Sequence, residues 1–267
     1  MHRIKRAIIM AAGLGNRMKP VTLKTPKPLV VVNGVRIIDT VIEALHENEI
    51  YEIYVVVGYL KEQFKSLEIQ YPGLKLIENP YYNVCNNIAS LYVARNYLED
   101  VIILDGDQII YNSKILCPEF EKSGYNSVWI EEETNEWLQT VEKGIKMNKK
   151  AQNYLDLIPV HNKNISYSVE NGIVKACSRN GGKRGWQLYS ISRWTAEDGK
   201  KLKKHLEIEF EIKMNRQIYW DDIPMFCHFE EYELGIWPMN RTDIIEIDNM
   251  AELIAVDNSY EKYLEEM

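Results

Sequence analysis

The stretch AIIMAAGLGNR, residues 7–17, decides the fold class. Residues 7–12 form a short and wholly apolar run, which is typical of a strand buried on both faces of a sheet. Gly13 and Gly15 follow this run directly and mark a turn. The stretch therefore predicts a buried strand that opens into a flexible glycine loop, and this loop carries Arg17.

Strands and helices alternate after this first strand. Further strands are expected at residues 29–32, 53–57, 74–77 and 101–104, with helices at 37–48, 60–67 and 87–98. This order predicts an α/β fold with a mostly parallel sheet and helices on both faces. The loops after parallel strands open on one edge, where ligands bind. We therefore expect the loops at 13–27 and 105–108 to face a ligand.

Beyond Tyr111 the pattern changes to shorter runs. Strands are expected at residues 127–131, 137–141, 173–176, 186–192 and 232–236, with helices at 196–206 and 250–264. No linker rich in Pro, Gly or Ser and no internal repeat separates the two halves. We therefore expect one domain over residues 1–267, with a first half at about 1–112 and a second half at about 113–267.

Composition and charge exclude several classes of protein. The chain has 267 residues, 46% hydrophobic and 27% charged, with a formal net charge of −7, so it is an ordinary globular chain and a poor candidate for nucleic-acid binding. Residues 1–36 nevertheless hold basic residues and no Asp or Glu, which predicts a local anion site. Four cysteines without a C-x-x-C pair favour a cytoplasmic location. No apolar run approaches the roughly 20 residues of a membrane span.

The glycine loop matches neither of two common nucleotide-binding motifs. A dinucleotide-binding loop needs a third glycine where Met18 stands, and a P-loop needs G-K-[ST], which is missing. What remains is a glycine loop with Arg17 and Lys19, whose backbone amides could cradle phosphates. Close by, Pro26 and Pro28 fix the backbone on both sides of Lys27. An ordinary turn lysine is the simpler interpretation, but this setting favours an ammonium group aimed at an anion.

Carboxylates and aromatic residues form the other candidate sites. Asp105 and Asp107 flank Gly106 at the end of a predicted strand, and two carboxylates on such a turn suit Mg²⁺. Asp221 or Asp222 could supply a further ligand. Five aromatic residues lie in the second half: Trp137, Trp186, Tyr189, Tyr219 and Trp220. Core packing explains each of them singly, whereas a cage around a quaternary ammonium would use several together.

Five stretches carry a resemblance to a known family. AIIMAAGLGNR at 7–17 and TPKPL at 25–29 resemble the motifs of nucleotidyltransferases that activate sugar phosphates and alcohol phosphates. Tyr82 with NNIASLY at 86–92, TNEW at 134–137 and YWD at 219–221 narrow the resemblance. Together they resemble the bacterial CTP:phosphocholine cytidylyltransferases over nearly the whole chain. Residues 145–170 match no segment of that family, and residues 186–189 depart from its pattern.

The resemblance implies a fold and a set of site residues. The fold would be the Rossmann-like nucleotide-diphospho-sugar transferase fold, with a nucleotide-binding half at 1–112 and an acceptor-binding half at 113–267 that holds a possible insertion at 145–170. The residues implied at the nucleotide phosphates are Ala11, Ala12, Gly13, Arg17 and Lys27. Those implied at the cytosine are Asn87, Ala89 and Ser90. Asp107 and Asp221 would bind Mg²⁺, and Trp137, Tyr219 and Trp220 would face choline.

The implied activity is Mg²⁺-dependent transfer of CMP from CTP to phosphocholine, giving CDP-choline and pyrophosphate. Arg17, Lys27, Asp107 and Asp221 would be the catalytic residues, and no Ser-His or Cys-His pair is needed because the acceptor phosphate is already ionised. Phosphoethanolamine, aminoethylphosphonate and a sugar 1-phosphate are alternative acceptors for the same chemistry. A non-catalytic nucleotide-sensing subunit is the alternative of another class, but it would not need Lys27, Asp107 and Asp221 together.

Overall fold

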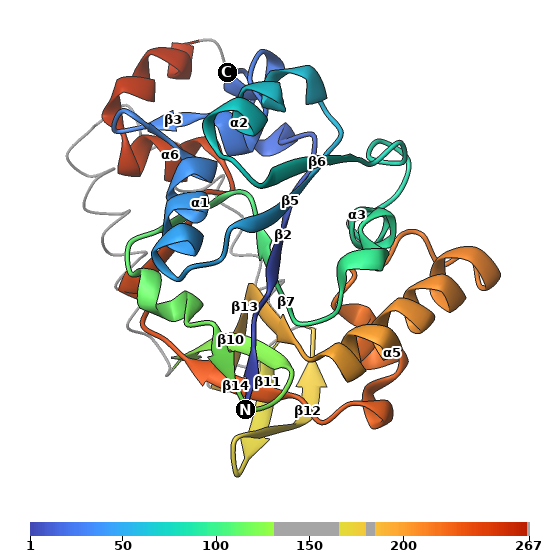
Figure 1. Ribbon diagram of the computed structural model, residues 1–267. Helices are drawn as coiled ribbons and strands as arrows, with labels where there is room; N and C mark the ends of the chain where they lie inside the picture. Colours follow the sequence, from blue (N-terminus) through green and yellow to red (C-terminus); the bar gives the residue numbers. More distant parts are fainter. Residues whose placement is uncertain (131–165, 180–184, 266–267) are drawn as a thin grey trace.

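Among the described residues, the main sheet has nine strands, in the order β10-β14-β12-β11-β13-β7-β2-β5-β6 (Figure 1). This arrangement comes from a computed structural model, which describes residues 1–130, 166–179 and 185–265. The strand expected at residues 137–141 lies outside the described residues. Among the described helices, none has the length and apolarity that crossing a membrane requires.

The parallel part of the sheet comes from the first half of the chain. It contains β2 (Arg6–Ala11), β5 (Glu52–Val57), β6 (Leu74–Glu78) and β7 (Val101–Asp105). β2 pairs in parallel with β5 and with β7, so that Ile8 lies beside Tyr54 and Ile103. The apolar runs predict β2, β5 and β7, because both faces of the sheet are covered there, whereas β6 lies at the edge and includes exposed Lys75.

The second half extends this sheet with mainly antiparallel pairings, so the expected mostly parallel sheet is wrong and the sheet is mixed. β13 (Gly185–Trp194) lies antiparallel to β7, with Ile191 opposite Leu104. Beyond β13 lie β10 (Gly124–Ile130), β11 (Ser166–Glu170), β12 (Ile173–Ser178) and β14 (Gly235–Pro238). β11 and β12 form an antiparallel hairpin, and Asn171 and Gly172 in its turn have positive φ. Neighbours joined by a tight turn run antiparallel, whereas parallel neighbours need a longer crossover connection.

Helices cover both faces of the sheet, as predicted (Figure 1). Alternate residues of β2 show this division, because Ala7 and Ile9 pack in one core cluster and Ile8 and Met10 in another. The first cluster includes α1 (Ile37–Glu47) and α2 (Lys65–Gln70). The second includes α3 (Ile88–Val93) and α5 (Ala196–Glu207). The helix expected at residues 87–98 is shorter, because α3 gives way to a 3₁₀ turn at Arg95–Tyr97.

The segment expected as a strand at residues 29–32 folds differently. Lys27–Leu29 is a 3₁₀ turn, because Pro26 and Pro28 cannot donate ladder hydrogen bonds. Only β3 (Val31–Val32) is extended, and it pairs with β4 (Val35–Arg36) outside the main sheet. Asn33 and Gly34 join the two at φ of 50° and 88°, as the turn signal predicts.

The C-terminal segment returns to the first half of the chain. β15 (Ile244–Glu246) pairs antiparallel with β8 (Gln108–Ile110), and α6 (Met250–Val256) follows. Met250 and Leu253 of α6 pack with Met18 and Val30 in a third core cluster. The helix expected to reach residue 264 ends at Val256 and continues as a 3₁₀ helix at Asn258–Glu265. The remaining pair, β1 (His2–Arg3) with β9 (Glu119–Phe120), lies apart from the main sheet.

Candidate active site

Lys27 lies at the centre of a group of charged side chains. Its ammonium nitrogen is 2.5 Å from Asp107 Oδ2 and 3.0 Å from Asp248 Oδ1, and the residue is only 8% exposed. Burial acts to lower the pKa of Lys27, but the carboxylates of Asp107, Asp248 and Glu246 outweigh it and raise the pKa above its usual range. Lys27, which lies between two prolines in a 3₁₀ turn, is thus a positive charge surrounded by carboxylates.

A tight turn after β7 aims Asp107 at Lys27. The amide of Gly106 donates to the carbonyl of Met10 at 2.9 Å. A Cβ atom at Gly106 would lie 3.1 Å from that carbonyl oxygen and 3.3 Å from Cγ of Pro28. The close approach of two backbone segments therefore favours glycine between Asp105 and Asp107, because a Cβ atom would make the neighbouring atoms shift.

Strand pairing brings two further carboxylates to Asp107. β15 places Glu246 opposite Gln108, and the amide of Ile247 donates to the carbonyl of Asp107 at 3.2 Å. Asp107, Glu246 and Asp248 each have a carboxylate oxygen within 4.8 Å of the other two. No motif in the sequence indicates Glu246 or Asp248 as site residues. Their spacing of two in IIEID, residues 244–248, puts both on one side of a strand, but no sequence signal shows that this strand pairs with β8.

This carboxylate cluster, Asp107, Glu246 and Asp248, has the properties of a site for a hard divalent cation. Its donors are all oxygens, and Oδ1 of Asp107 is buried without a hydrogen-bond partner. Burial and the charges of Asp107 and Asp248 raise the pKa of Glu246 well above its usual range. Burial, followed by Asp107, does the same to the pKa of Asp105. A divalent cation would relieve this repulsion more fully than Lys27 does alone.

Asp221 has different surroundings from the carboxylate cluster. Among the described residues its carboxylate belongs to no group of close metal-ligating atoms. It is near enough to Asp105 to raise the pKa of that carboxyl. Burial raises the pKa of Asp221 itself to about 7, although the charge of Arg179 opposes this shift. Neighbouring Asp222 forms an ion pair with Arg179 and accepts a hydrogen bond from the amide of Tyr219 at 2.9 Å.

The glycine loop supplies a second cation beside Lys27. Arg17 forms an ion pair with Asp248 at 2.7 Å, and its side chain is 63% exposed. Gly15 adopts a φ of 62°, and the hydroxyl of Thr22 donates to its carbonyl at 2.8 Å. Ala11 and Ala12 are buried at the end of β2, whereas Gly13 is exposed. The loop therefore presents Gly13 and Arg17 to solvent on the edge that holds Lys27 and Asp107.

The three residues expected at the cytosine lie at the start of α3. Ala89 is fully buried and Ser90 is 6% exposed, with its hydroxyl accepting from the Asn79 side chain at 3.0 Å. Asn87 is half-buried, and its side-chain oxygen accepts from the amide of Trp220 at 2.9 Å. Asn87 thus links the start of α3 to the segment YWDD, residues 219–222.

The four described aromatic residues of the candidate set, Trp186, Tyr189, Tyr219 and Trp220, do not gather into one cage. Trp137 lies outside the described residues. Trp220 is 2% exposed and packs against Tyr125 and Trp194 with ring centroids 6.0 and 6.1 Å apart, so its ring occupies the core. Trp186 and Tyr189 pack against opposite core clusters of the sheet.

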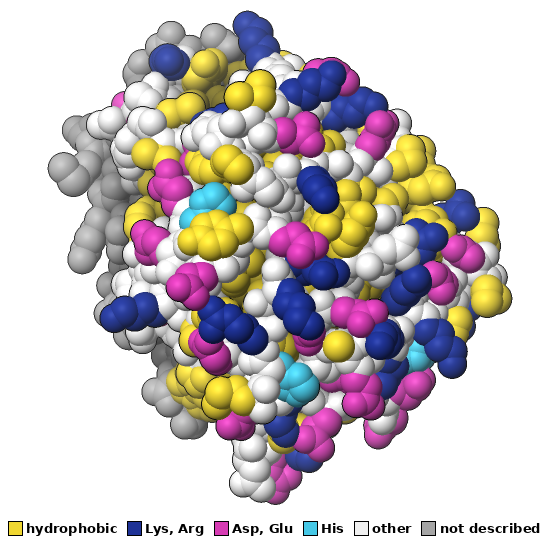
Figure 2. Space-filling model, viewed as in Figure 1, with side chains coloured by type: hydrophobic (Ala, Val, Ile, Leu, Met, Phe, Trp, Pro, Cys, Tyr) yellow, Lys and Arg dark blue, Asp and Glu magenta, His cyan; other side chains and the backbone are white. Residues whose placement is uncertain are grey.

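Among the described aromatic residues of the candidate set, Tyr219 is the most exposed, at 38%. The guanidinium of Arg179 lies 5.0 Å from its ring centroid and 5.3 Å from that of Phe226. A cation therefore already lies over these two rings, which shows that their surroundings favour positive charge. Elsewhere on the surface, basic and acidic side chains are mixed on the face that Figure 2 shows.

Comparisons with known proteins show which family the chain resembles. The family described as "MobA-like NTP transferase domain" matches residues 7–149. The chain is 35% identical to the 2-aminoethylphosphonate cytidylyltransferase of Lancefieldella rimae, over 95% of the chain and 92% of that protein. It is 31% identical to the choline-phosphate cytidylyltransferase of Streptococcus pneumoniae, over 92% of the chain and 94% of that protein.

Solved structures of nucleotidyltransferases are also similar to this chain. The CTP:phosphocholine cytidylyltransferase from Streptococcus pneumoniae superposes with a TM-score of 0.76 and 28% identity, and the match covers 98% of both chains. The inositol-1-phosphate CTP transferase from T. maritima has a TM-score of 0.68 at 15% identity, over 99% of this chain and 97% of that one, which shows a shared fold.

Proposed function

Because the chain belongs to the cytidylyltransferases of the nucleotidyltransferase family with a MobA-like NTP transferase domain, we propose that it transfers CMP from CTP to phosphocholine with the help of Mg²⁺. The observation that carries this proposal is the contact of Lys27 with Asp107 and Asp248, beside the phosphate-binding loop. A phosphate oxygen of the acceptor attacks the α-phosphorus of CTP, the bond to the β-phosphate oxygen breaks, and pyrophosphate leaves.

Positioning and charge neutralisation account for this reaction. Lys27 is fixed, cationic and buried, so its ammonium is suited to an α-phosphate that gains charge in the transition state. Arg17 is exposed on the glycine loop and is suited to the β- and γ-phosphates. Neither group needs to exchange a proton, because the acceptor oxygen is already ionised.

Asp107, Glu246 and Asp248 are the residues that we propose for Mg²⁺. They differ from the pair Asp107 and Asp221 that the resemblance implies, and we favour them because their carboxylate oxygens lie within 4.8 Å of one another. When bound, Mg²⁺ would neutralise charge on the triphosphate and on the leaving pyrophosphate. The chain's own contribution is to hold three carboxylates against two cations at the end of the parallel strands.

The acceptor is a small molecule with a phosphorus group and a cationic head. Tyr219 offers an exposed aromatic face, and Asp221 offers a carboxylate at the same segment. Phosphocholine is our first candidate for this site. A second candidate is 2-aminoethylphosphonate, which is favoured by the burial of Trp220 and by the relative from Lancefieldella rimae.

Pyrophosphate release over a grid of four nucleoside triphosphates and several acceptors tests the proposal. The acceptors are phosphocholine, phosphoethanolamine, 2-aminoethylphosphonate and glucose 1-phosphate, each with and without Mg²⁺. We expect turnover with CTP and the cationic acceptors in the presence of Mg²⁺. Preference for another nucleotide or for the sugar phosphate would refute the assignment of substrate.

A further inference from the structure

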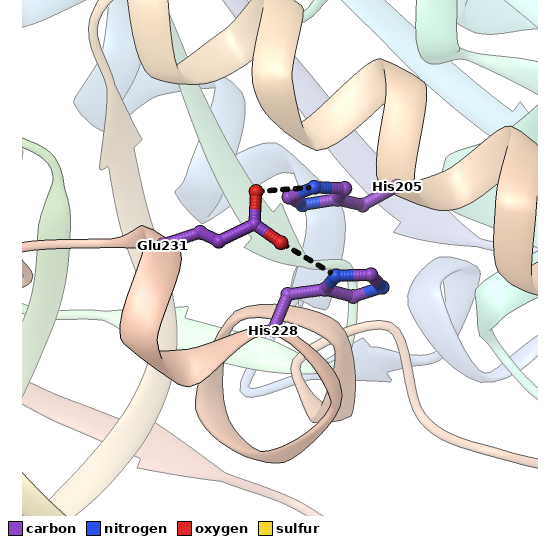
Figure 3. A group of neighbouring side chains, drawn as sticks. All are labelled: His205, His228 and Glu231. Atoms are coloured by element: carbon purple, nitrogen blue, oxygen red, sulfur yellow. Dashed lines mark hydrogen bonds and ion pairs between the residues drawn. The ribbon is translucent and has the colours of Figure 1, made fainter.

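Two histidines and a glutamate form a cluster that the proposed reaction does not use. His205 comes from α5, and His228 and Glu231 come from the turn after the π-helical segment Ile223–Cys227 (Figure 3). Each of the three offers a ligand atom within 4.8 Å of the other two. His205 Nε2 lies 3.2 Å from one oxygen of Glu231, and His228 Nδ1 lies 3.1 Å from the other. Glu231 therefore faces both imidazoles at once.

The contact that His228 makes with its other ring nitrogen, Nε2, determines where the ring hydrogen lies. His228 Nε2 is 3.0 Å from Oε1 of Glu209, a residue that is 1% exposed. A carboxylate oxygen accepts, so Nε2 carries the hydrogen of this contact. Nδ1 is then the ring nitrogen that faces an oxygen of Glu231, at 3.1 Å.

His205 has a matching arrangement. Its Nδ1 lies 2.7 Å from the hydroxyl oxygen of Tyr232, which can accept an N–H bond, and its Nε2 is directed at Glu231. Each imidazole thus has one nitrogen toward Glu231 and the other held by a separate partner. Metal-bound histidines commonly show this division, in which the second nitrogen donates to a carboxylate or another oxygen that fixes the ring.

We propose that His205, His228 and Glu231 bind a divalent transition-metal ion, with Zn²⁺ as the first candidate. Two imidazoles and one carboxylate suit Zn²⁺, whereas Mg²⁺ prefers oxygen ligands alone. The two rings are parallel, with centroids 3.8 Å apart, so they must turn toward the ion when it binds. Glu231 is 55% exposed, which leaves room for water as a fourth ligand.

The role of this ion would be structural. The amide of His228 donates to the carbonyl of Ile223 at 2.9 Å, so the histidine closes the helical segment that begins directly after YWDD, residues 219–222. An ion between His228 and His205 would fasten this segment to α5. The site stands on these contacts and does not depend on the identity of the acceptor.

Titration with Zn²⁺ in an excess of Mg²⁺ tests the proposal, because Mg²⁺ occupies the carboxylate cluster. Competition with a chromogenic chelator should show one Zn²⁺ bound per chain. At a Zn²⁺ concentration of about 100 times Kd, the Tm should rise by roughly 5–10 °C. Glu231→Gln, an exposed substitution that keeps the size of the side chain, should weaken Zn²⁺ binding at least about tenfold. Glu230→Gln, on the neighbouring exposed residue, is the matched control and should leave Kd unchanged.

Two results would overturn the proposal. One is the absence of Zn²⁺ binding by the wild-type chain in Mg²⁺, which would mean that a proton on His228 fills the gap to Glu231. The other is an equal Kd in wild-type protein and Glu231→Gln, which would place the ion elsewhere, for example at a cysteine. His228→Gln gives a second test of the same ligand set, with circular dichroism to establish that each variant is folded.

Discussion

Lys27 and Asp107 form an ion pair of 2.5 Å although 80 positions separate them in the sequence. Lys27 comes from a 3₁₀ turn between two prolines, and Asp107 from a glycine turn at the end of β7. Asp248 reaches the same ammonium from the C-terminal segment at 3.0 Å. Three segments that lie far apart in the sequence therefore contact the same ammonium group.

Lys27→Ala should lower kcat/KM by roughly 10²–10³, which corresponds to about 2.7–4 kcal/mol of lost transition-state stabilisation. The reason is that a preorganised, buried positive charge is removed from the phosphates. Steady-state kinetics with CTP at saturating Mg²⁺ measure this loss. Lys24→Ala is the matched control, because Lys24 is an exposed lysine on the same loop. A loss below about tenfold for Lys27→Ala would reduce Lys27 to a structural residue.

Asp248→Asn and Asp107→Asn should each raise the Mg²⁺ concentration needed for half-maximal turnover, by about tenfold or more, because each removes a charged oxygen ligand. Asp221→Asn should leave that concentration within about twofold of the wild-type value. Activity measured over a Mg²⁺ series separates the two sets of variants. The opposite pattern, with Asp107→Asn and Asp221→Asn sensitive to Mg²⁺ and Asp248→Asn unchanged, would restore the ligand pair that the resemblance implies.

The pH dependence of acceptor use should follow Asp221. Burial raises its pKa to about 7, so the carboxyl is neutral below this pH and ionised above it. If the ionised form attracts the cationic head of the acceptor, kcat/KM for the acceptor rises as pH increases through about 7. The ratio of the wild-type kcat/KM to the Asp221→Asn kcat/KM at each pH removes the effect of the acceptor phosphate's own titration. A ratio that does not change between pH 6 and 8 would speak against this role.

The same pKa shift has a consequence for stability. Asp221 binds its proton more tightly in the folded than in the unfolded chain, so between about pH 4 and pH 7 the folded state holds more protons. Its contribution to the free energy of unfolding therefore falls as pH rises through this window. The free energy of unfolding of the wild type minus that of Asp221→Asn, measured in urea, should therefore fall between about pH 4 and pH 7. A difference that rises over this window would contradict the sign of the shift.

Tyr219 and Trp220 should differ although they are neighbours. Tyr219→Ala removes a ring that is 38% exposed, so it should raise the KM of the acceptor more than that of CTP and leave Tm nearly unchanged. Trp220→Ala removes a ring that is 2% exposed, so it should destabilise the fold by about 3–5 kcal/mol. Thermal unfolding together with both KM values distinguishes these results. A stable Trp220→Ala variant with a raised acceptor KM would place Trp220 in the acceptor site after all.

Local patterns in the sequence predict the parallel strands and the positions of Lys27 and Asp107. Strand β2 is a continuous apolar run followed by glycines, and two prolines mark the turn of Lys27. These features depend on neighbours in the chain, so the sequence shows them directly. Residues 29–32 are apolar and so favour a strand, but Leu29 ends the 3₁₀ turn Lys27–Leu29 and only Val31–Val32 is extended, because two prolines limit ladder hydrogen bonding.

Long-range pairings could not be predicted in the same way. The direction of β13 against β7 and the pairing of β15 with β8 depend on contacts between segments far apart in sequence. For this reason the sequence does not indicate that Glu246 and Asp248 each have a carboxylate oxygen within 4.8 Å of one from Asp107. Burial is also a tertiary property, and it separates Trp220 in the core from exposed Tyr219.

The central claim is cytidylyl transfer to a cationic phosphorus acceptor, and one competition experiment tests it most directly. The enzyme is given CTP, Mg²⁺ and an equimolar mixture of phosphocholine, phosphoethanolamine, 2-aminoethylphosphonate and glucose 1-phosphate, and the nucleotide products are identified by mass spectrometry. We predict CDP-choline as the main product, with one pyrophosphate for each CMP transferred. A sugar nucleotide as the main product, or consumption of CTP without any CMP adduct, would contradict the account.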